Sequence, residues 1–175
     1  MKATIEAVLS VSRVFDDDAN RQVISNSGRD IKLRADKESE SQLIDALTNL
    51  APYPVLAEES GLIQPMSDAA RQWIVDPLDG TFNYYRNIPV YAISVALWDN
   101  GKPLLGVIYD VGNSSVYSGI AEHGAWIHNE SIHVSETDSL DQAGLATGFP
   151  VAMPMTTNSL TDFFPRIARF KKVRM

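Results

Sequence analysis

Cysteine is absent from the sequence, which has 175 residues. Without thiols the chain can form neither disulfide bonds nor thiolate metal sites. The absence does not identify the redox compartment of the protein. It permits a cytoplasmic location, which is the location we expect.

Long hydrophobic runs are absent as well. The longest apolar stretch, residues 91–98, is interrupted by Ser94 and falls far short of the ~20 apolar residues that span a bilayer. The N-terminus carries the acidic residue Glu6 and lacks a small-residue cleavage site after a long apolar core, so it does not resemble a signal peptide. We therefore expect a soluble protein without a membrane partner.

Positively charged residues are fewer than negatively charged ones. The chain has 15 Lys and Arg residues against 22 Asp and Glu residues, which gives a net charge of −7 and a pI of about 4.9. Proteins that bind nucleic acid or anionic membranes need a cationic surface to displace counterions from phosphates. The composition therefore argues against both partners and suits a protein that collects cations.

The residues that are present indicate a globular fold with helices in its first part. Hydrophobic residues make up 45% of the chain, enough for the core of one domain, or of one domain plus a fragment. Helical spacing of apolar residues predicts a helix over residues 3–15. A stripe of leucine and isoleucine predicts a second helix, with Asp36 near its start and Pro52 after its end. The polar residues 16–30 predict a loop, which a short extended segment at residues 30–34 follows.

Signals for β-strands dominate after the second helix. Asp99-Asn100-Gly101-Lys102 is a strong hairpin signal, which predicts that residues 93–98 pair antiparallel with residues 104–109. Further short strands are expected at residues 54–57, 73–75, 116–120, 125–128 and 132–135. The predicted fold class is α+β, with an antiparallel sheet flanked by the two helices.

A second set of elements is expected near the C-terminus. Residues 143–147 have the pattern of a strand, residues 161–170 that of a short helix, and residues 171–175 that of the beginning of a further strand.

The segment that carries most chemical information runs from Trp73 to Asn83, where an apolar strand leads into Asp-Pro-Leu-Asp-Gly-Thr. Pro77 stiffens the turn, so Asp76 and Asp79 can direct their carboxylates, together with the Leu78 carbonyl, at one point. Three hard oxygen ligands in a short turn suit Mg²⁺.

Two further features extend this candidate site. Gly80-Thr81 can open a short helix whose free N–H groups would hold a phosphate. Upstream, Glu58-Glu59 follows another apolar strand, and one of these carboxylates could complete an all-oxygen cation site. The alternative reading is structural: an Asp-Pro turn with Asp79 as a helix N-cap, and a solvated acidic loop at Glu58-Glu59.

Taken together, these motifs resemble a known family. Ala57-Glu58-Glu59-Ser60 and the segment 73–83 are similar to the two N-terminal signatures of the inositol monophosphatase family, whose members are Mg²⁺-dependent, lithium-sensitive phosphatases of small phosphate monoesters. The resemblance implies that the metal is held by Glu58, Asp76, the Leu78 carbonyl and Asp79. It implies that Asp79, Gly80 and Thr81 bind the substrate phosphate, and that Glu58, Thr81 and Asp36 take part in catalysis.

The resemblance also implies a fold and an activity. The fold would be the N-terminal part of a layered αβαβα sugar-phosphatase fold, and the reaction the hydrolysis of an inositol or sugar monophosphate by metal-activated water. Thr81 with an acid, Glu58 or Asp36, would orient or deprotonate that water. As partners we expect a small phosphorylated substrate, and either a second copy of the chain, as a homodimer, or the missing C-terminal part.

Alternatives remain open at this point. Fructose-1,6-bisphosphatase and bisphosphate nucleotidase share the metal motifs, and a truncated remnant that binds metal or a partner without catalysis is a different class of function. Arg34-Ala35 stands where many family members place a threonine near Asp36, which leaves the hydroxyl link between Asp36 and the site in question. A plain N-cap at Asp36 is the other reading of that residue.

Length is the largest departure from the family pattern. Family members continue with a Gly-Ser-Ala-Ala segment and then a Trp-Asp pair that supplies another metal ligand, and the given sequence stops at Met175 before either. We therefore expect residues 1–138 to form an N-terminal α+β domain that binds metal and phosphate, and residues 139–175 to begin a second, truncated α/β domain. Little or no phosphatase activity is expected of these residues alone.

Overall fold

The computed structural model describes residues 1–27, 30–63, 70–148 and 156–174. The chain divides into two compact units, Met1–His133 and Val134–Met175. The predicted domain boundary after residue 138 stays a prediction. Within the described ranges, every helix is too short or too polar to span a lipid bilayer.

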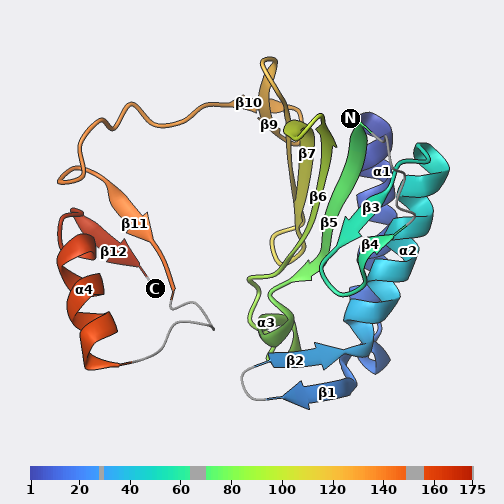
Figure 1. Ribbon diagram of the computed structural model, residues 1–175, viewed down its shortest axis with the longest axis horizontal. Helices are drawn as coiled ribbons and strands as arrows, with labels where there is room; N and C mark the ends of the chain where they lie inside the picture. Colours follow the sequence, from blue (N-terminus) through green and yellow to red (C-terminus); the bar gives the residue numbers. More distant parts are fainter. Residues whose placement is uncertain (28–29, 64–69, 149–155, 175) are drawn as a thin grey trace. The chain divides into compact units, whose positions relative to one another are not determined.

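An eight-stranded sheet forms the centre of the first unit (Figure 1). Its strand order is β10-β9-β8-β7-β6-β5-β3-β4. The strands are β3 Val55–Ala57, β4 Gly61–Ile63, β5 Arg71–Asp79, β6 Ala92–Asp99, β7 Lys102–Asp110, β8 Ser115–Ile120, β9 Gly124–Ile127 and β10 Glu130–Ile132. The α+β class is confirmed, but the sheet is mixed rather than purely antiparallel, because β3 runs parallel to β5.

The predicted hairpin in the middle of the sheet is confirmed. β6 and β7 pair antiparallel, with Ile93 opposite Tyr109 and Leu97 opposite Leu105. Asn100 and Gly101 both have positive φ angles, 50° and 76°. This is the backbone that a tight two-residue hairpin turn requires, and it explains why the Asn-Gly pair predicts the turn so well.

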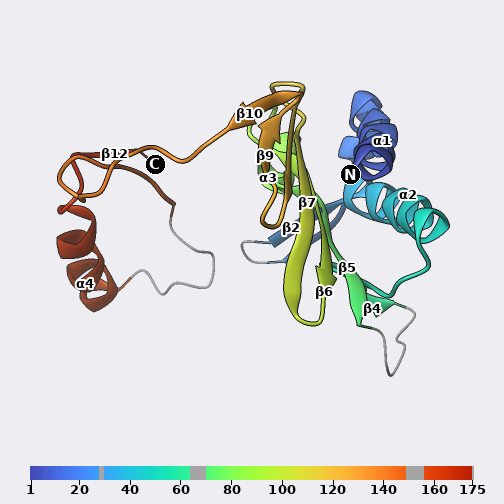
Figure 2. The same ribbon diagram turned by 90° about the horizontal axis from the view of Figure 1, so that it is seen from above.

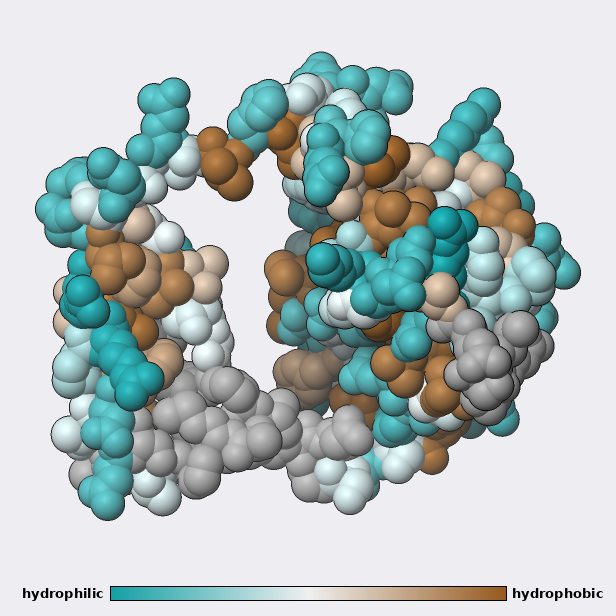
Figure 3. All heavy atoms as spheres, turned by 45° about the horizontal axis from the view of Figure 1, so that its top comes forward, coloured by the Kyte–Doolittle hydropathy of each residue, from teal (hydrophilic) through white to brown (hydrophobic). Residues whose placement is uncertain are grey.

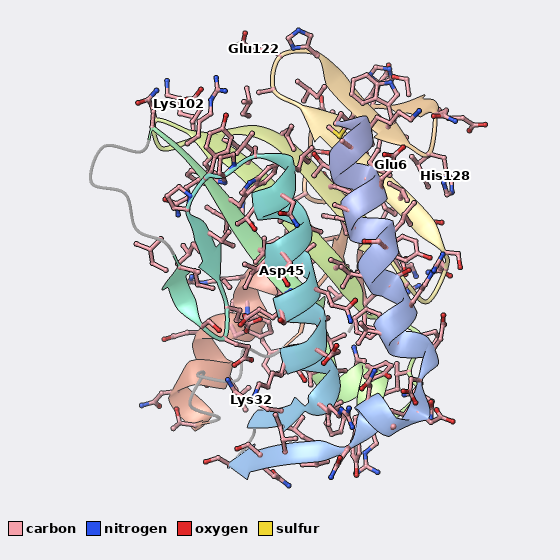
Figure 4. All side chains as sticks on the ribbon, turned by 90° about the vertical axis from the view of Figure 1, so that its right-hand side faces the viewer. Glu6, Lys32, Asp45, Lys102, Glu122 and His128 are labelled. Atoms are coloured by element: carbon pink, nitrogen blue, oxygen red, sulfur yellow. The ribbon has the colours of Figure 1, made fainter. Side chains whose placement is uncertain are left out.

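Two antiparallel helices, α1 Lys2–Val11 and α2 Arg34–Leu50, lie side by side on one face of the sheet (Figures 2 and 4). They bury an apolar stripe against the inward residues of alternating strands. The core residues that these elements share include Val8, Val11, Leu43, Leu47, Trp73, Val75, Ile93, Val95 and Val107. Burial of this apolar surface is the main force that holds the layers together.

Alternation along the strands places other hydrophobic residues on the opposite face of the sheet. Val107 and Val116 are buried under the helices, whereas their neighbours Ile108 and Tyr117, which pair with each other, are exposed. The space-filling view shows hydrophobic side chains at the surface beside hydrophilic ones (Figure 3). The helices of the first unit therefore cover one face of its sheet only.

The segment between the two helices differs from the prediction. The first helix ends at Val11, and two 3₁₀ helices follow, η1 Ser12–Asp16 and η2 Asp18–Arg21. The loop expected at residues 16–30 is wrong in part, because β1 Val23–Ser27 pairs antiparallel with β2 Asp30–Leu33. All of β1 is solvent-exposed, so it lacks the alternation of apolar and polar residues by which strands are predicted.

A short helix, α3 Thr81–Tyr85, follows β5 and lies next to β2 (Figure 1). Tyr84 anchors it in the core: its ring packs edge-on against those of Phe15 and Tyr91, each with a centroid distance of 5.3 Å. The Arg21 guanidinium lies 4.1 Å from the centre of the Tyr84 ring, and the Tyr84 hydroxyl donates a hydrogen bond of 3.3 Å to the Phe15 carbonyl. These contacts fix α3 against the N-terminal segment.

The second unit contains a small parallel sheet and one helix. β11 Gly144–Ala146 pairs with β12 Lys172–Arg174, and α4 Thr157–Ile167 lies between them in sequence. Both strands were predicted. The helix begins and ends earlier than the expected residues 161–170, and residues 149–155 lie outside the described ranges.

The buried Tyr84 predicts a loss of stability in alkaline solution. Burial raises the pKa of Tyr84, so the folded state holds this proton more tightly than the unfolded chain does. The resulting stability is present below the ordinary tyrosine pKa of about 10 and is lost as the pH rises through the folded-state pKa. Tyr84→Phe should therefore lose less unfolding free energy than the wild type between about pH 9 and pH 11 in urea titrations.

The matched control is Tyr85→Phe, which removes a less buried hydroxyl from the same helix. Tyr91 will keep part of the alkaline effect in both variants, because burial raises its pKa too. If Tyr84→Phe and Tyr85→Phe lose stability equally with pH, Tyr84 is not the source of the effect.

Candidate active site

The acidic turn predicted after the apolar strand is part of β5 itself. The pairing of β5 with β6 is regular up to Asp76 and resumes at Asp79, with an irregularity between these residues. Pro77 has no N–H to donate to the ladder, which is why the strand departs from regular pairing here. Within the turn, the Leu78 N–H donates a hydrogen bond of 3.1 Å to Asp76 Oδ1.

Glu58 is brought to the same place by strand pairing. In the parallel pair of β3 and β5, Ala57 lies opposite Val75, so Glu58, directly after β3, and Asp76, within β5, lie at the same end of the sheet. Burial raises the pKa of Asp76 to about 7, and the neighbouring carboxylates of Glu58 and Asp79 contribute to the rise. Asp76 therefore lies close to two other carboxylates, those of Glu58 and Asp79.

The second glutamate of the pair has a different environment. Glu59 forms an ion pair with Lys32 of β2, which lies beside the start of α2 (Figure 4). Glu58, by contrast, faces Asp76 closely enough to affect its pKa. The structure thus distinguishes the two adjacent glutamates, a choice that the residue pattern left open and for which the family resemblance implied Glu58.

Asp36 connects α2 to the acidic turn. Its Oδ1 accepts a hydrogen bond of 2.7 Å from the Thr81 hydroxyl, and its Oδ2 accepts one of 2.7 Å from the Leu33 N–H. Leu33 is the N-cap residue of α2, so the second bond satisfies a backbone N–H at the start of that helix. Asp36 is therefore a helix-capping residue and a partner of Thr81 at once. The hydroxyl link that Arg34-Ala35 left in question is present, because Thr81 makes it.

Burial raises the pKa of Asp36, while the hydrogen bonds from Thr81 and Leu33 act in the opposite direction. The Thr81 hydroxyl also lies 3.2 Å from the Leu78 carbonyl. Thr81, Asp36 and the backbone of the acidic turn thus form one hydrogen-bonded unit.

Sequence reasoning missed one residue of this region, Glu40. It is buried on α2, with 5% of its surface exposed. Its Oε2 accepts a hydrogen bond of 3.2 Å from the Glu59 N–H, and its Oε1 accepts one from the Ser60 hydroxyl. The available signal was its spacing: Asp36 and Glu40 are four residues apart and share one face of the helix.

Gly80 occupies a position that excludes a side chain. Its φ angle is +93°, in the left-handed region, and a Cβ atom would lie 2.8 Å from the Val90 carbonyl oxygen and 3.1 Å from Tyr91 Cβ. Gly80 and Asp79 also line a cavity of about 640 Å³, whose wall includes Asn83, Asp110 and Tyr117. The absence of a side chain at Gly80 thus allows the backbone to turn sharply from β5 into α3, next to this cavity.

The donor chemistry of the site fits a hard divalent cation. Glu58, Asp76, Asp79 and the Leu78 carbonyl offer only oxygen ligands, which Mg²⁺ prefers. Burial, and after it the neighbouring Glu58 carboxylate, raises the pKa of Asp76. Among the described residues, no three acidic or histidine side chains are arranged closely enough to hold a metal ion by themselves.

The sequence matches the inositol monophosphatase family over residues 1–173. It is 29% identical to Nus factor SuhB of Vibrio cholerae over 177 aligned residues, which cover 98% of this chain and 66% of the relative. It is 32% identical to inositol-1-monophosphatase of Mesorhizobium japonicum over 151 residues, which cover 86% of this chain and 56% of the relative. The chain therefore spans between about half and two thirds of the length of these relatives.

Solved structures agree with the sequence matches. The extragenic suppressor protein suhB of Bartonella henselae superimposes with a TM-score of 0.87 at 30% identity, over 99% of this chain and 69% of the other. Inositol monophosphatase of Anabaena superimposes with a TM-score of 0.82 at 31% identity, over 99% of this chain and 64% of the other. The fold of this chain is that of the N-terminal part of such structures.

The tight turn at Gly80 predicts a specific cost of substitution. Gly80→Ala should destabilise the protein by about 1–3 kcal/mol, because the new methyl group meets Val90 and Tyr91 in addition to the strain of a positive φ. Gly61→Ala is the control, since Gly61 has a φ of +69° but no atom within 4 Å of the added Cβ. Urea denaturation should show the larger loss for Gly80→Ala, and equal losses would contradict the close approach.

Proposed function

The chain belongs to the inositol monophosphatase family, and from this premise we propose that it serves the Mg²⁺-dependent hydrolysis of small phosphate monoesters, with inositol or sugar monophosphates as the substrate class. The observation that carries the proposal is the closeness of the Asp76 carboxylate to those of Glu58 and Asp79, beside the hydrogen bond between Thr81 and Asp36.

Phosphate monoesters hydrolyse extremely slowly in water, so their catalysis requires neutralisation of charge and a positioned nucleophile. Glu58, Asp76, Asp79 and the Leu78 carbonyl are the residues that would hold Mg²⁺ here. When bound, the metal would neutralise phosphate charge and lower the pKa of a coordinated water. The protein contributes the placement of the ligands, which the pairing of β3 with β5 sets.

Thr81 and Asp36 can assist the nucleophile. Because the Thr81 hydroxyl donates to Asp36, its lone pairs remain available to accept a proton from a nearby water. The raised pKa of Asp36 makes that carboxylate a better final acceptor of the proton. Water orientation and proton removal are thus the roles we assign to this pair.

The substrate phosphate would lie against Asp79, Gly80 and Thr81. The Gly80 and Thr81 N–H groups are suitable donors to phosphate oxygens. The adjoining cavity of about 640 Å³ has the size of a small-molecule site. This volume supports a small substrate rather than a polymer.

The relatives are longer, and the family resemblance implies a further metal ligand beyond the segment described. We therefore propose that full turnover needs a second copy of the chain or additional sequence.

A role like that of the relatives named Nus factor SuhB is the second candidate function, favoured by the match to the Vibrio cholerae protein. That role would not require phosphate release.

Removal of a single carboxylate tests the metal site. Asp76→Asn and Asp79→Asn keep the side-chain shape but remove a negative ligand, so each should weaken Mg²⁺ binding at least about tenfold in calorimetric titrations. Asp45→Asn is the control, because Asp45 is an exposed acid on α2 (Figure 4). Wild-type Mg²⁺ affinity in Asp76→Asn would exclude Asp76 as a ligand.

Thr81 tests the catalytic assignment. In a preparation that releases phosphate from an inositol monophosphate, Thr81→Ala should lower kcat by roughly 10² to 10⁴, the range for loss of acid–base assistance. Thr81→Ser keeps the hydroxyl that donates to Asp36 and should retain most of the activity. An unchanged kcat in Thr81→Ala would reduce Thr81 to a residue at the start of α3.

A further inference from the structure

One helix contacts both turns that carry the candidate metal ligands. Asp36 of α2 accepts a hydrogen bond from Thr81, which follows Asp76 and Asp79 in the turn between β5 and α3. Glu40 of α2 accepts two hydrogen bonds from Glu59 and Ser60, which follow Glu58 in the turn between β3 and β4. The two acids are four residues apart on the helix, about 6 Å along its axis.

We propose that Glu40 is a positioning residue of the metal site, which fixes the turn that carries Glu58 so that this carboxylate stays opposite Asp76. The inference rests on the proposed metal site and adds a residue that does not itself touch the metal or the substrate. Glu40 acts on the backbone: its bond to the Glu59 N–H holds the peptide unit directly after Glu58.

The environment of Glu40 supports a role beyond packing. A buried carboxylate is costly to remove from water, and a neutral side chain of similar volume would fill the space at a lower cost. Both oxygens of Glu40 are used on a single turn, one for a backbone N–H and one for a hydroxyl. This arrangement restrains the turn at two successive residues.

The turn is held from its other side as well. Lys32 pairs with the Glu59 side chain, while Glu40 holds the Glu59 backbone. Glu59 is thereby engaged with two elements, β2 and α2, and only Glu58 of the two glutamates faces Asp76. The restraints therefore select which glutamate is presented to the metal.

Two substitutions of Glu40 separate placement from charge. Glu40→Ala removes both acceptors, and we expect it to weaken Mg²⁺ binding by at least about tenfold, the range for loss of a group that orients a ligand. Glu40→Gln keeps an oxygen for the Glu59 N–H and offers an amide N–H to the Ser60 oxygen, so it should retain most of the affinity. Asp45→Ala removes an exposed acid from the same helix and should bind as the wild type does.

The experiment is a calorimetric Mg²⁺ titration of the full 175-residue chain and its variants, at a temperature where circular dichroism shows each to be folded. Folded Glu40→Ala with wild-type affinity would overturn the inference, because a residue that only stabilises the fold leaves the affinity of the folded protein unchanged. Equal losses in Glu40→Gln and Glu40→Ala would also overturn it, since charge and not placement would then matter.

Ser60→Ala provides a second test should Glu40→Ala fail to fold. Ser60 is exposed, and its substitution removes only one of the two hydrogen bonds to Glu40. We expect a measurable but smaller loss of Mg²⁺ affinity than tenfold. Wild-type affinity in Ser60→Ala would overturn the inference in that case. If the wild-type chain binds no Mg²⁺, the proposed metal site fails and this inference with it, whereas a failure of Glu40 alone leaves the metal site intact.

Discussion

The candidate site depends on one departure from regularity, the parallel pairing of β3 with β5 in a sheet that is otherwise antiparallel. Antiparallel neighbours send the residues that follow them to opposite ends of the sheet, whereas parallel neighbours send them to the same end. Glu58 and Asp76 meet for this reason alone. Had β3 run in the other direction, the two acidic motifs would lie at opposite ends of the sheet.

Burying Asp76 and placing it beside other carboxylates costs electrostatic free energy, and both causes raise its pKa. The surrounding structure offsets this cost by fixing the neighbouring acids with donors: Lys32 for Glu59, and Thr81 with the Leu33 N–H for Asp36. A divalent cation in the proposed metal site would relieve the remaining repulsion.

The sequence was sufficient for the features that local patterns determine. The apolar stripe of α2 and the Asn100-Gly101 turn follow from helical periodicity and turn chemistry, and both are present. It was insufficient where partners are distant or no pattern exists. Exposed β1 has no apolar alternation, three-residue β4 is too short to show one, and the direction of β3 relative to β5 depends on the whole chain. Glu40 reads as a polar helix residue until the turn that it holds is known.

The strand order has a consequence for folding. From β5 to β10, each strand pairs with the next along the chain, so this meander consists of relatively local contacts, which generally form early. The hydrogen bond between Thr81 and Asp36 instead joins residues 45 positions apart, and the entropy of closing that loop delays it. Interactions that form after the rate-limiting step mainly affect the unfolding rate. A cation held at this sheet edge would accordingly lengthen the lifetime of the native state and leave the speed of folding almost unchanged.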